Sequence, residues 1–476
     1  MSDTAKKNAT FGAKAFLASF FILLGLMVAA GILTRMIPVG SFDRAIAAGG
    51  EILVPGSYHL IPRPDYPVWR WFTAPFEVLA SPDAMTAIVI IAFIAIAGGS
   101  FSIFTEAKVL EAAVASLSRR FSGRRYLLLA AVSLFGMLLG AVMGVFEESV
   151  LLVPIGIALA ASLGWDVFTG LGMSVLAVGF GFAAAISNPF SIGTAQRLAG
   201  LPLFSGSGFR VFVFVLCYLL YLFFLIRHAK RTEKAEALMT GSEEPRLDTK
   251  VAVLELPEGA ARGVKVFAAS LLILFALILV VALTPGLSDF SMPMMALAFL
   301  IAGIVSGAAS GIGAKRILRS FASGAFAVLP AGILILMALS VKRIILSGGV
   351  LDTVLYQAAE AAKGTSPYGA AALAYLLTLA MEFFIGSASA KAFLLMPMLA
   401  PLADLTGLSR QIMVQAYAFG DGFSNMLYPT NAVLLISLSL AGVSWPKWVK
   451  WILPLQIAVF VLTMGLLMLA VAIGYS

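Results

Sequence analysis

Two short stretches, Ala185-Ile186-Ser187-Asn188-Pro189-Phe190 and Leu427-Tyr428-Pro429-Thr430-Asn431, each interrupt an apolar segment of the sequence. Proline lacks a backbone N–H and disrupts the helix around it, so both segments are predicted to unwind there. Half-helix N-termini at membrane depth favour anionic groups, whereas carbonyls freed by unwinding suit Na⁺. We therefore predict two broken transmembrane helices that bind a solute or an ion through Ser187, Asn188, Pro189, Thr430 and Asn431.

A simpler interpretation of each stretch is a proline kink in which the serine or asparagine caps its own helix. Such kinks are common in membrane helices, but two at equivalent places in the chain favour the binding interpretation. On that interpretation, a Na⁺ site would lie near Ser187, Asn188, Thr430 and Asn431.

The two stretches belong to a longer internal repeat. A shift of 243 residues, which pairs Asn188 with Asn431, also pairs Leu151-Leu152-Val153-Pro154 with Leu394-Leu395-Met396-Pro397. Matches of leucine and glycine arise easily in this composition, but a proline and an asparagine in one register do not. The shift therefore predicts two structural repeats.

Upstream of each break, a second apolar block is interrupted by mostly small or polar residues. The predicted arms are 126–143 and 150–164 in the first half, and 368–385 and 392–406 in the second. The shorter arms do not comfortably span a bilayer, and polar tips are tolerated only where protein or a wet cavity surrounds them. We predict two re-entrant hairpins whose tips contribute Glu147, Glu148, Ser149, Ser387, Ser389 and Lys391 to the site.

Ionisable residues inside membrane segments are costly, which makes them candidates for function. The 243-residue shift places Lys391 opposite Glu148, and two interpretations stay open: an ion pair between the hairpins, or contacts to the solute from opposite sides. Asp421 is interpreted as a cation ligand or a proton carrier. Glu382, about one helical turn before the second tip, either shares that site or pairs with Lys391.

The composition is that of a polytopic membrane protein. Of 476 residues, 61% are hydrophobic and 12% are charged, against about half and a quarter in soluble domains. Apolar runs of roughly 16 to 24 residues, about enough to cross 30 Å of hydrocarbon, recur along the chain. The first, near 14–37, is too long for a signal peptide and is predicted to be retained as a spanning helix.

Basic clusters at the segment ends orient the chain. Short loops rich in Lys and Arg stay in the cytoplasm, which places the N-terminus and the polar linker Thr232–Pro257 inside. Surface stretches near 105–120 and 350–363 then occupy matching places in the two halves but on opposite faces of the membrane. That arrangement is typical of inverted-topology repeats.

Other kinds of site are disfavoured. A single cysteine, Cys217, excludes an intrachain disulfide, and the two histidines, His59 and His228, are predicted to lie in loops. No cofactor is therefore expected apart from a coupling Na⁺. The net charge of +8 sits at segment ends, so it indicates topology and not nucleic-acid binding.

The hairpin Glu147–Pro154 and the stretches Gly179–Gln196 and Gly420–Asn431 resemble the C4-dicarboxylate anaerobic carrier family. Within it, Gly420-Asp421-Gly422-Phe423-Ser424-Asn425 is most similar to the YfcC-like branch, and this motif adds Asn425 to the candidate site. The family belongs to the ion transporter superfamily, with the divalent anion/sodium symporters. The resemblance covers roughly residues 14–474. It implies a homodimer in the cytoplasmic membrane, and carriers of C4-dicarboxylates or of basic amino acids such as arginine and ornithine.

The resemblance also implies a static scaffold and a transport domain that moves as an elevator. The expected fold is an all-α polytopic membrane protein with two inverted repeats, each holding a re-entrant hairpin and a broken transmembrane helix. The expected parts are a cytoplasmic N-terminus (1–13), repeat 1 scaffold helices (14–120), the repeat 1 hairpin and broken helix (121–208), a transmembrane helix (209–231), a cytoplasmic linker (232–263), repeat 2 scaffold helices (264–363), the repeat 2 hairpin and broken helix (364–445) and a last transmembrane helix (446–476).

The hairpin tips depart from the family pattern. Sodium symporters in the superfamily carry Ser-Asn-Thr there, whereas this chain has Glu-Glu-Ser and Ser-Ala-Ser-Ala-Lys. Coupling by Na⁺, coupling by H⁺ and exchange therefore all stay open. A dicarboxylate suits Lys391 but not two nearby glutamates, whereas an amino acid would use both signs of charge. Charge favours a carboxylate with an amino group, and the family name favours a dicarboxylate.

The predicted function is secondary active transport of a small carboxylate-bearing solute. A channel of similar architecture would show only downhill flux and would not need paired broken helices. A membrane-embedded enzyme would need a nucleophile–base pair or metal ligands at one depth. With no histidine expected in the helices and one cysteine, little beyond a carboxylate mechanism remains for an enzyme.

Overall fold

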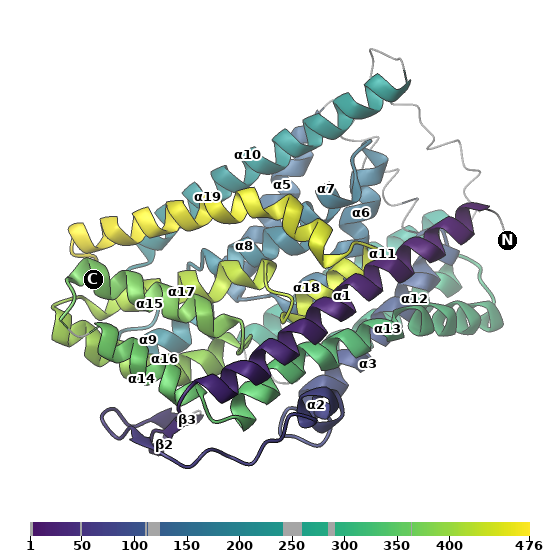
Figure 1. Ribbon diagram of the computed structural model, residues 1–476. Coiled ribbons are helices and arrows are strands. Elements are labelled where there is room, and N and C mark those ends of the chain that lie inside the picture. The colour runs from purple at the N-terminus through teal and green to yellow at the C-terminus, as the bar shows by residue number, and fades with distance from the viewer. Residues whose placement is uncertain are drawn as a thin grey trace.

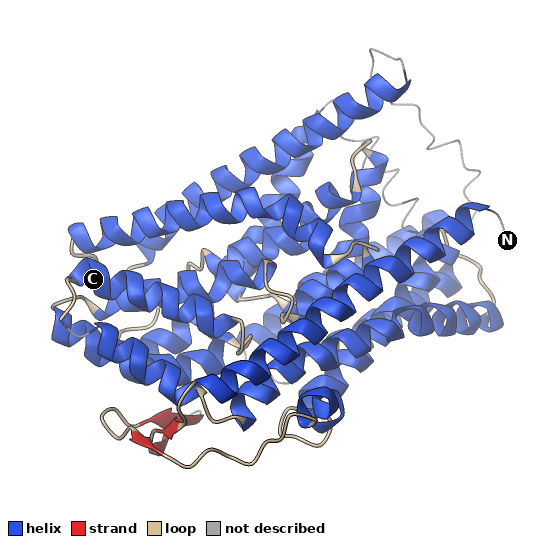
Figure 2. Cartoon of the chain, viewed as in Figure 1, coloured by secondary structure: helices blue, strands red, loops and turns tan. Residues whose placement is uncertain are grey.

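The computed structural model describes residues 3–47, 50–109, 112, 124–240, 259–283, 291–362 and 364–476. Apart from four short strands, the ordered elements of this part of the chain are helices (Figure 2). Seven helices among the described residues are long and apolar enough to cross a membrane: Phe16–Met36, Ala87–Glu106, Arg125–Met143, Ser207–Glu233, Ala314–Ser347, Ala388–Thr406 and Trp445–Ala472. The expectation of an all-helical polytopic membrane protein is met.

The first spanning helix leads into a small folded segment at one end of the molecule. Helix α1 (Asp3–Met36) is followed by β1 (Gly40–Ser41), which pairs antiparallel with β4 (His59–Leu60). Between them, β2 (Arg44–Ala47) pairs antiparallel with β3 (Gly50–Leu53). Asp352 anchors the segment, because its carboxylate accepts the backbone N–H of Phe42 at 3.0 Å and pairs with Arg44 at 3.1 Å.

One group of helices is built on α13 (Figure 1). Its members are α1, α2 (Arg70–Val78), α3 (Ala84–Glu106), α11 (Ala260–Leu283), α12 (Ser291–Ala309) and α13 (Ala314–Ser347). Helices α1, α2 and α3 pack on α13, α12 packs mainly on α3, and α11 packs on α12. Phe104 contacts Phe101, Phe267 and Phe299 edge to face where α3, α11 and α12 meet. Lys342, near the end of α13, forms an ion pair with Asp83 at 2.8 Å.

The remaining elements hold the predicted hairpins and breaks. Those of the first half are α5 (Arg125–Leu138), the π-helical η2 (Leu139–Met143), the 3-10 helix η3 (Glu147–Leu152), α6 (Val153–Ser162), α7 (Val167–Leu171), the π-helical η4 (Gly172–Leu176), α8 (Ala177–Ala183), the π-helical η5 (Pro189–Gly193), α9 (Thr194–Leu198) and α10 (Ser207–Thr240). Those of the second half are α14 (Leu351–Ala362), α15 (Pro367–Glu382), α16 (Ala388–Thr406), α17 (Arg410–Gly422), the 3-10 helix η7 (Phe423–Met426), α18 (Ala432–Leu440) and α19 (Trp445–Ala472). Helices α10 and α19 pack side by side along one edge (Figure 1).

Several boundaries differ from the predicted ones. Helix α1 already begins at Asp3, and α10 continues to Thr240, past residue 231 where the polar linker was expected to begin. His228 therefore lies in a helix and not in a loop, and its imidazole contacts the Asp166 carboxylate at 3.0 Å. His59 lies in β4. Most of the predicted surface stretch 105–120, and the linker from 241 to 258, lie outside the described residues.

Candidate solute- and ion-binding site

The first break follows the end of α8. The chain leaves the helix after Ala183 and resumes at Pro189, whose fixed backbone angle suits the first position of a helix. Asn188 caps the new helix, because its Oδ1 accepts backbone N–H groups from Phe190 at 2.9 Å and Ser191 at 3.3 Å. The Asn188 side chain is fully buried, and neither its Nδ2 nor the Ser191 hydroxyl has a hydrogen-bond partner. Two buried donors are thus unsatisfied at the first break.

The first hairpin packs directly on this break. The backbone N–H groups of Ile186 and Ser187 both donate to the carbonyl of Ala141, at 2.9 and 3.0 Å. Gly144 ends η2 with a left-handed φ of 71°, and a β-carbon there would overlap Asn188 Oδ1. Only glycine adopts this conformation without strain and leaves room for the cap.

The tip of the first hairpin is the 3-10 helix η3. The Glu147 side chain is exposed, whereas Glu148 is half-buried and its carboxylate accepts the Phe146 N–H at 3.1 Å. Ser149 is buried and donates to the carbonyl of Phe146 at 2.5 Å. Of these predicted site residues, Glu147 is the one that an approaching solute could reach directly, while Ser149 stabilises the turn.

The second break contains a chain of side-chain hydrogen bonds. Asn431 caps α18, accepting the Leu434 N–H at 3.1 Å, and its Nδ2 donates to Asn425 Oδ1 at 2.5 Å. Asn425 in turn donates to the Asp421 carbonyl at 2.9 Å. Thr430 lies immediately before the cap. In contrast to Asn188, both amide groups of the second break have partners.

A buried ion cluster joins the second hairpin to the second broken helix. Ser387, the predicted tip, instead caps α16 by accepting the Ala390 N–H at 3.4 Å, so Lys391 lies in the first turn of the helix. The Lys391 ammonium is 2.6 Å from Asp421 Oδ1 and also contacts Glu382 Oε2. All three side chains are at most 1% exposed.

The ion cluster shows which carboxylates neutralise Lys391. Its observed ion pairs are with Glu382 and Asp421, both in the second half, and not with Glu148 across the hairpins. Lys391 is therefore already neutralised by protein carboxylates. Glu382 is one of the partners that the sequence offers for Lys391, although it is not among the residues predicted for the site. The signal that identifies it is a single carboxylate at the end of an otherwise uncharged helix, α15.

The two halves contact each other reciprocally. A β-carbon at Gly179 would lie 2.8 Å from Met426, and one at Gly422 would overlap Ala183. The shift of 243 residues exchanges these two contacts. Likewise η3 of the first hairpin packs on α18, while α16 of the second hairpin packs on η5 and α9, where Ser389 donates to the Phe190 carbonyl at 3.1 Å. Each hairpin thus touches the half-helix of the other half.

A further buried residue, Arg210 at the start of α10, holds the first break from behind. Its guanidinium donates to the carbonyl of Ile186 at 2.8 Å and to that of Ser205 at 2.7 Å, and it contacts the Tyr475 hydroxyl at 3.1 Å. The sequence places Arg210 at a predicted segment boundary, where arginine usually reaches the membrane interface. No local pattern shows that it turns inward.

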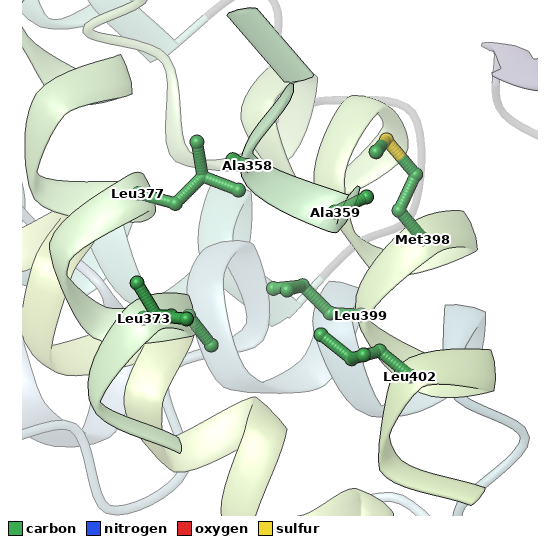
Figure 3. Close-up of a pocket in the computed structure, with 8 residues that line it drawn as sticks. Ala358, Ala359, Leu373, Leu377, Met398, Leu399 and Leu402 are labelled. Atoms are coloured by element: carbon green, nitrogen blue, oxygen red, sulfur yellow. The ribbon is translucent and has the colours of Figure 1, made fainter. Parts of the chain in front are cut away.

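In the described part of the chain, neither the apolar pocket of the second half nor a cluster of metal ligands adds to the candidate site. The pocket between α14, α15 and α16 has no polar side chain to bind a carboxylate (Figure 3); it is lined by Ala358, Ala359, Leu373, Ala374, Leu377, Met398, Leu399 and Leu402. Within the described residues, no three His, Cys, Asp or Glu side chains are grouped so that they could hold a metal ion. The Na⁺ site near both breaks stays a prediction.

Comparison with known proteins decides the family. The family model described as C4-dicarboxylate anaerobic carrier (DcuC) matches residues 16–472. The chain belongs to this family. As a member, it is a membrane carrier, which confirms the resemblance found in the sequence.

Relatives of the chain cover nearly all of it. A putative basic amino acid antiporter, YfcC of Escherichia coli, is 30% identical over 90% of this carrier and 91% of the relative. An uncharacterized protein of Haemophilus influenzae is 26% identical over 95% of this chain and 96% of that protein. Among solved structures, Neisseria gonorrhoeae MtrF, described as illuminating a class of antimetabolite efflux pumps, covers 94% of this chain and 93% of its own at 16% identity, with a TM-score of 0.41. That structural likeness is too distant to support an argument.

Proposed function

We propose that this carrier is a secondary active transporter that moves a small carboxylate-bearing solute across the cytoplasmic membrane. It would work as a homodimer, with the hairpins and broken helices moving as an elevator against the α13 group. Membership of a carrier family supports transport over a membrane-embedded enzyme, and two broken helices beside two hairpins support a carrier over a channel.

The observation that carries the choice of solute is the first break. Asn188 Nδ2 and the Ser191 hydroxyl are buried donors without partners, beside the N-terminus of the η5–α9 half-helix. Buried donors are normally satisfied, so an unsatisfied pair requires an explanation. A carboxylate supplies two acceptor oxygens and the negative charge that a helix N-terminus favours.

The charges nearby favour an amino acid. Glu147 is exposed and Glu148 is half-buried at the adjoining hairpin tip, and together they would attract an ammonium or guanidinium group. Lys391, the one cation predicted to face the solute, is occupied by Glu382 and Asp421 and is poorly placed to bind a second carboxylate. The name of the YfcC relative agrees with an amino acid, while the family description keeps a C4-dicarboxylate as the second candidate.

The reciprocal contacts support an inverted repeat. Suppose that two halves are related by a twofold axis and that residue i of the first half contacts residue j of the second. The residue equivalent to i in the second half must then contact the residue equivalent to j in the first half. The pairs Gly179–Met426 and Ala183–Gly422 meet this requirement. An axis in the membrane plane would place both breaks at one depth and let either side of the membrane reach them in turn.

Uptake into liposomes tests the proposal. Purified protein would be reconstituted and offered radiolabelled L-arginine or succinate, with an imposed Na⁺ gradient, a pH gradient, or unlabelled solute inside. We expect accumulation of arginine against its gradient, and less or none of succinate. Dependence on the inside solute would indicate exchange, and purely downhill flux of either solute would contradict a carrier.

Asn188→Ala provides the control. It should abolish uptake while the protein elutes at the same volume on size-exclusion chromatography, because the change removes the donor and leaves the fold. Full uptake by this variant would refute the role of the first break.

A further inference from the structure

We propose that Glu382 and Asp421 share one proton, held beside Lys391, and that this proton is the ion the carrier couples to its solute. The proton site stands on the ion cluster alone, whereas its role in coupling rests on the transport function proposed above.

The charge count of the cluster carries the inference. Two carboxylates and one ammonium, each at most 1% exposed, leave one negative charge uncompensated if all three are ionised. Among the described residues, the ion pairs of Glu382 and Asp421 are both with Lys391. An uncompensated charge without water is highly unfavourable, and two carboxylates that share a site cannot both ionise readily. One bound proton neutralises the cluster.

The geometry leaves a position for that proton. Asp421 Oδ1 faces Lys391, but Asp421 Oδ2 is buried and has no hydrogen-bond partner. The titratable groups that face Asp421 are Glu382 from α15, Lys391 from α16 and Tyr417 from its own helix. The Tyr417 hydroxyl donates to the Ala388 carbonyl, so it does not satisfy the carboxylate.

A proton fits this position better than a metal cation. Alkali and alkaline-earth cations require several oxygen ligands around them. The Lys391 ammonium already occupies the space between the two carboxylates and would repel a second cation. A proton adds to one carboxylate oxygen, as RCOO⁻ + H⁺ → RCOOH, and needs no further ligand.

The cluster is connected to both breaks. Asn425 donates to the backbone carbonyl of Asp421 and accepts from Asn431, the cap of the second half-helix. From Lys391, two residues along α16, Ser389 reaches the Phe190 carbonyl in the first half-helix. Loss of the proton would restore a buried negative charge and disturb both breaks, so proton binding and solute binding would favour the same arrangement.

Infrared spectroscopy of the full-length protein tests the site without a known solute. A protonated carboxylic acid shows a C=O stretching band that is distinct from the bands of carboxylate and amide groups. We expect wild-type protein in liposomes near neutral pH to show this band, and Glu382→Gln and Asp421→Asn each to abolish it. Asp352→Asn, which removes a buried carboxylate already paired with Arg44, is the matched control and should leave the band unchanged.

The outcomes separate this proposal from the function. Absence of the band in wild-type protein, or its persistence in both cluster variants, overturns the proton site. If either variant fails to fold, loss of the wild-type band as the pH is raised supports the site, and a band that is absent throughout refutes it. A third outcome is a wild-type protein that lacks the band and whose unfolding temperature rises with Na⁺. If Asp421→Asn abolishes that rise, the cluster binds a cation and the proton site is refuted. If arginine and succinate uptake both fail while the band behaves as expected, the proposed function falls and the proton site stands.

Discussion

The two breaks occupy equivalent places in the chain but leave opposite groups unsatisfied. At the first, the unpartnered atoms are the donor Asn188 Nδ2 and the Ser191 hydroxyl. At the second, Asn431 donates to Asn425 and Asn425 donates to the Asp421 carbonyl, and the nearby Asp421 Oδ2 is an acceptor without a partner. A donor without a partner suits an anionic group of a solute, and an acceptor without a partner suits a proton. On the functions proposed above, two similar backbones would serve two roles, solute binding at the first break and proton binding near the second.

The helix caps show how alike the two backbones are. Asn188 and Asn431 cap the second half of each broken helix, and Asp166 and Ser409 cap the first half. Each pair is related by the same shift of 243 residues. The surrounding charges, and not the backbone, make the two sites different.

The largest effect should come from Lys391→Met. The change leaves two buried carboxylates without their ammonium partner, and removing one member of a buried ion pair costs about 3–5 kcal/mol. Glu148, the residue equivalent to Lys391 in the first half, is only half-buried and accepts a backbone N–H, so its replacement should cost less. Thermal unfolding of the purified protein measures the loss, and the double variant Lys391→Met/Asp421→Asn should recover part of it. Wild-type stability in the single variant would contradict the ion cluster.

The second largest effect should be a difference in stability between glycine substitutions at the two hairpin tips. Gly144→Ala forces a left-handed backbone on alanine, at about 1–2 kcal/mol, and pushes on the Asn188 cap, so both stability and uptake should fall. Gly386→Ala at the second tip is the matched control, because its β-carbon would meet only Glu382 Oε1 at 3.8 Å. Unfolding temperatures of the two variants should differ by several degrees, and equal values would refute the close contact at the first tip.

The caps themselves should separate stability from transport. Asn188→Ala loses an N-cap worth about 1 kcal/mol and the donor, whereas Asn188→Ser keeps a capping oxygen and exchanges the amide donor for a hydroxyl on a shorter side chain. We expect both variants to lose uptake, with Asn188→Ser close to wild type in stability. Asn431→Ser also breaks the bond to Asn425 and should cost about 1 kcal/mol more than Asn188→Ser. Uptake and unfolding temperature would be measured for each variant, and normal transport by Asn188→Ala would exclude the donor role.

The smallest difference should appear at acid pH. Burial raises the pKa of Asp166, but hydrogen bonds and charge from His228, with bonds from Thr169, outweigh it, so this pKa lies below its ordinary value. Because the folded-state pKa is depressed, the stabilisation is present above the unfolded-state value of about 4 and is lost as pH falls through the folded value. Asp166→Ser, which copies the Ser409 cap, should flatten the fall of unfolding temperature below that pH. If the unfolding temperature of the variant falls with pH just as that of the wild type does, the Asp166–His228 contact is not the cause of the fall.

The two breaks and the two hairpin interruptions follow from local chemistry, and the sequence predicted where they lie. The caps agree with the simpler interpretation of each stretch, because Asn188 and Asn431 each cap the helix that follows. Proline disrupts the helix around it at Pro189 and at Pro429, and both breaks fall near their predicted positions. The hairpin interruptions also fall near theirs, where small or polar residues replace the apolar run. Helix ends were less accurate: α10 continues to Thr240 because charged residues can extend a helix beyond the apolar run. Hydropathy detects the apolar run and not the end of the helix.

The side-chain partners were beyond prediction. Lys391 was placed opposite Glu148 by repeat register, yet it pairs with Glu382 and Asp421. Register shows which residues are equivalent, but contact depends on how three helices pack. Arg210 was missed for the same reason, since only the fold brings the Ile186 carbonyl to it.

The sequence by itself determined that this chain is a helical membrane carrier of a known family with two interrupted blocks, because hydropathy, proline and register are local properties. Only the tertiary structure decided which charges neutralise each other and which donors stay unsatisfied. Those outcomes depend on distances between segments far apart in the chain. In the membrane interior, water is not there to satisfy a polar side chain. The position of a neighbouring side chain therefore decides whether an ionised group is paired or is left to bind a solute or ion.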